Sequence, residues 1–176
     1  DIERNLCIQA STVDEVLHSL DLVGEAIGEL AAARSLRCQL EQRLDEVSSR
    51  ICTKARPRVL GLECVCPLVA SGQWLPDMRL RAGAIDALGD GPGAAPRRLT
   101  WEEVHESRPD VVIILCCGRS AQDAAAETSL HLINQPGFAE LPALKARPPR
   151  LYFIGHELCS RPSLRVVEGI EQLAAL

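Results

Sequence analysis

Apolar residues recur every three or four positions along the first third of the chain. This spacing predicts an amphipathic helical region of about 40 residues. A single helix of that length, rising about 1.5 Å per residue, would reach roughly 60 Å. Gly24 and Gly28 interrupt the pattern, so two consecutive helices are the alternative. The apolar positions are Val16, Leu20, Val23, Ile27, Leu30, Leu36, Leu40, Leu44, Val47 and Ile51.

Beyond Pro57 the pattern changes to short, unbroken apolar runs. Three of them, at 58–63, 109–118 and 150–155, have the composition of strands buried on both faces. Helical patterns and loops lie between and after these runs. Strands that alternate with helices predict an α/β fold, a three-layer lobe in which helices cover both faces of a mostly parallel sheet. The predicted helices cover 75–84, 100–108, 120–133 and 162–176.

The charge of the chain limits the partners that it can bind. The formal net charge is −5, and the sequence has no run of basic residues. Both features argue against nucleic acid and anionic membrane surfaces as main partners. No apolar stretch approaches the roughly 20 residues of a transmembrane segment. The chain begins at Asp1 without a positively charged leader, which we interpret as a fragment or a processed product.

Side chains suited to binding gather where the three predicted strands end. In an open α/β sheet, ligands bind beyond the carboxyl ends of the strands. Five of the eight cysteines and one of the four histidines fall at this edge. The three strands deliver, in order, Glu63, Cys64 and Cys66; then Cys116, Cys117 and Gly118; then His156, Glu157 and Cys159.

The cysteines at this edge allow three interpretations. The first is a thiolate and imidazole site for zinc or a softer metal, although the sequence has no CxxC pair. The second is a redox disulfide, such as one between Cys64 and Cys117. The third is that the thiols are buried and act as small hydrophobic side chains. The metal site would use Cys64, Cys66, Cys116, Cys117, His156 and Cys159.

Motifs for covalent catalysis are absent from the sequence. It contains no GxSxG elbow, no glycine-rich phosphate loop and no HExxH. The prolines of the 88–96 segment remove amide donors that a phosphate cradle would need. We therefore expect a binding protein and not an enzyme. Trp74, which follows Gly72 in a predicted loop, either stacks on a ligand or covers the core.

Several segments follow one another in the order of a known family. They are TVDEVLHSLDLVGEAIG, RPRVLGLECVCPLVASGQWLPDMRLRAGA, RRLTWEEVHESRPDVVIILCCG, PGFAELPAL and RPSLRVVEGIEQLA. With these segments, the chain from about Ser11 to Leu176 resembles the second half of a cobalamin- or iron-siderophore-type substrate-binding protein of ABC importers. The cobalamin-type members are most similar, through Glu63, Pro67, the Gly72-Gln73-Trp74 run, Cys117 and Gly118.

The resemblance implies a division of the chain into three parts. Residues 11–56 would be a long helical connector between two lobes, residues 57–176 the C-terminal ligand-binding lobe, and residues 1–10 a remnant of an absent N-terminal lobe. The ligand, a cobalamin-like molecule or an iron chelate, would be clamped between the lobes and passed to an ABC permease, with no cofactor required. The residues expected to contact it are Glu63, Cys64, Cys66, Trp74, Cys117, Gly118, His156, Glu157 and Leu158.

The resemblance also implies an extracytoplasmic or periplasmic location, whereas the number of cysteines makes a reducing compartment the alternative.

Two other functions stay open. One is the cysteine-based metal or redox site, and the other is a degenerate lobe that acts as an interaction module. In the second case the apolar stripe of the connector would be uncovered, and the chain would form a homodimer.

Overall fold

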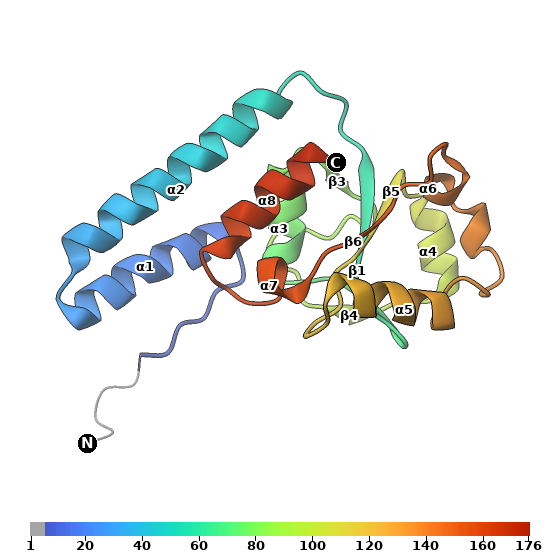
Figure 1. Cartoon of the computed structure of the whole chain (residues 1–176), viewed down its shortest axis with the longest axis horizontal. Coiled ribbons are helices and arrows are strands. Elements are labelled where there is room, and N and C mark those ends of the chain that lie inside the picture. The colour runs from blue at the N-terminus through green and yellow to red at the C-terminus, as the bar shows by residue number, and fades with distance from the viewer. Residues whose placement is uncertain (1–5) are drawn as a thin grey trace.

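The computed structural model describes residues 6–176 (Figure 1). Residues 6–10 have no regular secondary structure, and residues 1–5 of the predicted lobe remnant lie outside the described residues. The helices are α1 (Val13–Ile27), α2 (Leu30–Ile51), α3 (Trp74–Arg81), α4 (Trp101–Ser107), α5 (Ala121–His131), η1 (Phe138–Glu140), α6 (Pro142–Lys145), α7 (His156–Cys159) and α8 (Arg165–Ala175). The strands are β1 (Arg58–Val65), β2 (Leu68–Ala70), β3 (Ile85–Asp86), β4 (Arg97–Arg98), β5 (Val111–Ile114) and β6 (Leu151–Phe153).

The sheet has the strand order β4-β2-β1-β5-β6, and β3 pairs with the start of β1. Strands β1, β5 and β6 are parallel neighbours, as the alternation of strands and helices predicts. Strands β2 and β4 are antiparallel additions that the sequence analysis does not predict. β2 returns along β1 after a turn at Cys66 and Pro67, so the two strands form a β-hairpin.

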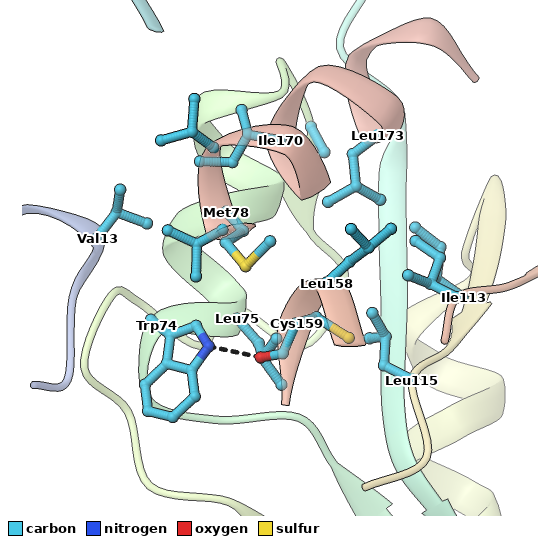
Figure 2. Close-up of a cluster of buried hydrophobic side chains, with 14 of the residues drawn as sticks. Val13, Trp74, Leu75, Met78, Ile113, Leu115, Leu158, Cys159, Ile170 and Leu173 are labelled. Atoms are coloured by element: carbon cyan, nitrogen blue, oxygen red, sulfur yellow. Dashed lines mark hydrogen bonds between the residues drawn. The ribbon is translucent and has the colours of Figure 1, made fainter. Parts of the chain in front are cut away.

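Two separate hydrophobic cores cover the two faces of the sheet. At the start of β1, adjacent residues face different cores, with Val59 in one and Leu60 in the other. The first core packs α1, α2, α3, α7 and α8 against the sheet, and Figure 2 shows its centre. The second packs α4, α5 and α6 against the opposite face. The predicted three-layer α/β arrangement is therefore confirmed.

The N-terminal helical region consists of two helices that fold back on each other (Figure 1). The break lies at Gly28, which ends α1 with a φ of 79° in the left-handed region. Gly24 sits where α1 meets α2, because a Cβ atom there would lie 2.4 Å from the Cβ of Ala33. The two-helix alternative is thus confirmed, and a single helix running straight through the region is wrong.

The helical hairpin is fixed to the lobe at its base. The amide of Val13 donates to the Asp77 carboxylate of α3 at 2.8 Å, and Arg81 bridges Asp77 and Asp14. On α2, Arg43 forms two hydrogen bonds to Glu171 of α8, at 2.8 and 2.6 Å. The apolar stripe of the hairpin is buried near the lobe and exposed at the tip. Val16, Leu40 and Val47 near the lobe are buried, whereas Val23 and Ile27 at the tip are exposed.

Within residues 6–176, no helix has both the length and the apolar character needed to cross a membrane.

Local sequence signals explain several helix starts. Capping boxes begin α1 at Thr12 and Glu15, α4 at Thr100 and Glu103, and α5 at Ser120 and Asp123.

Candidate functional site

Backbone hydrogen bonds bring the ends of the three parallel strands together. The amide of Cys117 donates to the carbonyl of Glu63 at 3.3 Å, which joins the segment after β5 to β1. The amide of His156 donates to the carbonyl of Arg119 at 3.0 Å, which joins the segment after β6 to the same loop. The carboxyl edge of the sheet that the sequence predicts is therefore formed from these three segments.

An open depression of about 300 Å³ lies at this edge. We call it the carboxyl-edge depression. It is the place where predicted site residues from different strands meet, because β1 and β5 both contribute thiols to its wall. The predicted residues that line it are Glu63, Cys64, Cys66, Cys116 and Cys117.

Three further residues of the depression were not predicted as site residues. The guanidinium Nε of Arg119 lies 2.9 Å from the Glu127 carboxylate, and His131 stands one turn beyond Glu127 on α5. Positions 127 and 131 differ by four, so they share a helix face. That spacing was a signal in the sequence, but only the packing of α5 on the sheet shows that this face points to the strand ends.

Glu63 is a carboxyl group of the depression whose pKa is shifted by its surroundings. Its side chain is half-buried, and the Gly72 amide approaches one of its oxygens at 3.4 Å. Burial raises the pKa of Glu63 above its ordinary value, and the hydrogen bond from Gly72 offsets part of that rise. Burial of this carboxyl group therefore favours its protonated form relative to that of an exposed glutamate.

The thiols of the edge fall into two groups. Cys66 and Cys117 are exposed and Cys64 is half-buried, so a ligand in the depression can reach all three. Cys116 and Cys159 are buried, and burial raises the pKa of each thiol to about 11. These two cysteines are protonated at neutral pH and behave as small hydrophobic side chains.

The structure does not assemble the predicted metal site. Cys116 and Cys159 belong to the cores on opposite faces of the sheet, so the six predicted ligands cannot meet at one ion. Within residues 6–176, no group of three or more His, Cys, Asp or Glu side chains is arranged to hold a metal ion. The predicted pairing of Cys64 with Cys117 is not formed either, since all eight cysteines are free thiols.

Two residues predicted to contact the ligand are core residues instead. Trp74 is only 8% exposed, and its Nε1 donates a hydrogen bond to the Cys159 carbonyl at 2.6 Å (Figure 2). Leu158 is 7% exposed and packs in the same core. Trp74 therefore covers the core, which was one of its two predicted roles. Leu158 turns inward because the chain after β6 forms the short helix α7.

The remaining predicted residues lie at the carboxyl edge but outside the depression. His156 is half-buried at the start of α7, and Glu157 is exposed beside it. Gly118 is exposed and has a φ of 71°, so it allows the turn that follows Cys117. The carboxyl edge thus has a depression lined by thiols and carboxylates, and the segment after β6 lies beside it.

Comparison with known proteins identifies the fold. The family model described as "Periplasmic binding protein" matches residues 5–155. An iron-binding or periplasmic solute-binding protein of Staphylococcus epidermidis, so described only as a possible assignment, has 18% identity and a TM-score of 0.80 over 97% of this chain and 64% of its own. The periplasmic vitamin B12-binding protein of Vibrio cholerae has 17% identity and a TM-score of 0.75, over 96% of this chain and 62% of its own.

A third solved structure, IsdE of Staphylococcus aureus complexed with heme, has 13% identity and a TM-score of 0.84, over 98% of this chain and 67% of its own. At these identities the likeness establishes the fold. The chain spans less than two thirds of the length of the Staphylococcus epidermidis and Vibrio cholerae proteins. No curated protein sequence matches the chain. The extent of the family match nevertheless shows that the chain belongs to the periplasmic binding protein family.

Proposed function

We propose that this chain is one lobe of an extracytoplasmic solute-binding protein, and that it holds a cobalamin-like ligand or an iron chelate at the carboxyl edge of its sheet for delivery to an ABC importer. The observation that supports this most is the convergence of the segments after β1, β5 and β6 at one edge of the sheet, where the first two segments line the carboxyl-edge depression. Proteins of similar fold are described as a vitamin B12-binding protein, a protein complexed with heme and an ABC-type Fe³⁺-hydroxamate transport system.

The size and chemistry of the depression agree with a large ligand held on one side. Its volume of about 300 Å³ is at the lower end of the range of about 300–1,000 Å³ for ligand pockets. A corrin or porphyrin would therefore be covered on one face only, and a second surface would complete the site. Cys64, Cys66 and Cys117 offer soft, polarisable sulfur atoms to that face.

The scaffold suits a binding role because its parts are fixed. The depression is formed by paired strands and by a helix packed on the second core, and the helical hairpin is held at its base by ion pairs. Binding then needs little ordering of the protein, which lowers the free-energy cost of association.

The experiment is a titration of the chain with cyanocobalamin, haemin and a ferric hydroxamate, followed by amide NMR. The proposal predicts saturable shifts for at least one ligand at 63–66 and 117–119. The exposed Cys117→Trp variant should weaken that binding at least tenfold by filling the depression, whereas the exposed Ala126→Ser control should not. If none of the three ligands gives saturable shifts at these segments, the proposal is wrong.

A further inference from the structure

A second cavity lies at the opposite edge of the sheet. Its volume is about 510 Å³, and it is enclosed by the segment joining α2 to β1, the amino ends of β5 and β6, and the end of α8. Figure 1 shows the end of α8 beside the segment that leads from α2 into β1. We call it the amino-edge cavity. Because β1, β5 and β6 are parallel, it lies at the other end of these strands from the carboxyl-edge depression.

The floor of the amino-edge cavity is apolar. Val59 of β1, Ile113 of β5 and Leu173 of α8 belong to the first hydrophobic core, and all three also line the cavity. An apolar group that enters the cavity would therefore extend this core and leave water.

The rim of the same cavity is cationic. Lys54, Arg56 and Arg150 are exposed and line it, and Asp110 is the acidic residue among the lining side chains. Arg56 donates to the carbonyl of Ala84 at 2.9 Å, which holds its guanidinium at the rim. Within residues 6–176, none of the three cations takes part in an ion pair. The rim is thus positive in a chain whose net charge is −5.

A buried guanidinium, whose charge is already paired, also lines the cavity. Arg79 lines the cavity and is only 3% exposed. It is paired with Asp86 and donates to the Ser71 hydroxyl, but its Nε has no hydrogen-bond partner within residues 6–176. Buried donors without a partner are uncommon and mark places where an acceptor is still lacking.

We propose that the amino-edge cavity is a second ligand site, for a small amphipathic anion such as a medium-chain aliphatic carboxylate. The aliphatic part would pack on Val59, Ile113 and Leu173, and the carboxylate would lie at the rim near Arg56 and Arg150. Arginine suits this role because its planar guanidinium can donate two parallel hydrogen bonds to a carboxylate. The cavity volume lies within the range of about 300–1,000 Å³ for small-molecule pockets.

The test is calorimetric titration with octanoate below its micelle-forming concentration. Two comparison ligands separate the parts of the site: octanamide has the chain without the charge, and acetate has the charge without the chain. We expect saturable 1:1 binding of octanoate, with affinity at least tenfold above that of octanamide and of acetate. Binding should also weaken as salt concentration rises, because salt screens the rim charges.

Variants identify the place of binding. Arg56→Glu and Arg150→Glu should each weaken octanoate binding at least tenfold, whereas Arg34→Glu makes the same charge change at an exposed position outside the cavity and should leave it unchanged. Ala175→Trp adds bulk at an exposed lining position of α8 and should also block binding. Equal affinity for octanoate and octanamide, absence of saturable binding, or unchanged binding in the three cavity variants would each overturn the proposal.

Discussion

The two edges of the sheet differ in the volume, the charge and the chemistry of their cavities. The carboxyl edge has an open depression of about 300 Å³ lined by thiols, two carboxylates, one histidine and one arginine. The amino edge has a larger cavity of about 510 Å³, in which a cationic rim lies above an apolar floor. The two ends of one sheet therefore differ in their chemistry: strand direction sets which residues reach each edge, and burial sets which of them stay accessible there.

The largest effect that sharpens this comparison concerns Leu158, which lies beside the carboxyl edge but belongs to the core. Leu158→Ala should lower the free energy of unfolding by about 2–5 kcal/mol, because it leaves a cavity in a packed core. The exposed neighbour Glu157→Ala should change it by less than about 0.5 kcal/mol. Urea denaturation measures both values. Similar, small values for the two variants would mean that Leu158 is a surface residue after all.

The thiols of the carboxyl edge provide the next test. A thiol with a pKa of about 11, as burial gives Cys116 and Cys159, is about a hundredfold less ionised at neutral pH than one with the ordinary value of 9.0. Since the thiolate is the reactive form, both should react with maleimide at least a hundredfold more slowly than the exposed Cys66 and Cys117. Mass spectrometry of digested protein gives the rate at each site. Equal rates at the four cysteines would contradict the assigned burial.

A substitution that restricts only the backbone of the loop after β5 should lower the stability of the protein. Gly118 has a φ of 71° and open space around its Cα, so Gly118→Ala adds strain without a clash. We expect a loss of roughly 1–2 kcal/mol in the free energy of unfolding. Gly91→Ala is the matched control, because Gly91 also has open space but no left-handed φ. A loss at Gly91 as large as that at Gly118 would refute this explanation.

The smallest effect expected is the pH dependence caused by Glu63. Its pKa is raised in the folded protein, so the stability it contributes is complete below the ordinary value of 4.5 and is lost as pH rises through the folded value. Glu63→Gln has no such loss. The melting temperature of Glu63→Gln should therefore exceed that of the unchanged protein at pH 7, and the difference should disappear at about pH 4. A difference that grows on acidification would contradict the assigned direction.

The sequence predicts the layers of the fold better than it predicts the surface of the site. Unbroken apolar runs and alternating helices indicate that β1, β5 and β6 are strands of a parallel sheet, and the structure pairs them in parallel. β2 has three residues and β4 has two, which is too short for a periodic pattern to be read. The chain reverses direction at Gly28, and the sequence shows this point as an interruption of the apolar pattern. The direction that α2 then takes depends on its packing against α8.

For the site residues, the sequence predicts which edge of the sheet they reach but not which of them are exposed there. Chain position correctly brings Glu63, Cys64, Cys66 and Cys117 to one edge, because strand direction alone places them there. It cannot distinguish Trp74 and Leu158 from surface residues, since that depends on how the short α7 packs against α3 and α8. It also passes over His131, whose role at the edge follows from the orientation of α5.

The most direct test of the account is a reciprocal blocking measurement on one protein. Cys117→Trp fills the carboxyl-edge depression, and Ala175→Trp fills the amino-edge cavity. Each variant is titrated with octanoate and with whichever of cyanocobalamin, haemin and ferric hydroxamate binds the unchanged chain. The account predicts that Cys117→Trp weakens only the chelate at least tenfold and that Ala175→Trp weakens only octanoate. If Ala175→Trp abolishes binding of the chelate while Cys117→Trp leaves it unchanged, the carboxyl edge is not the ligand-binding surface.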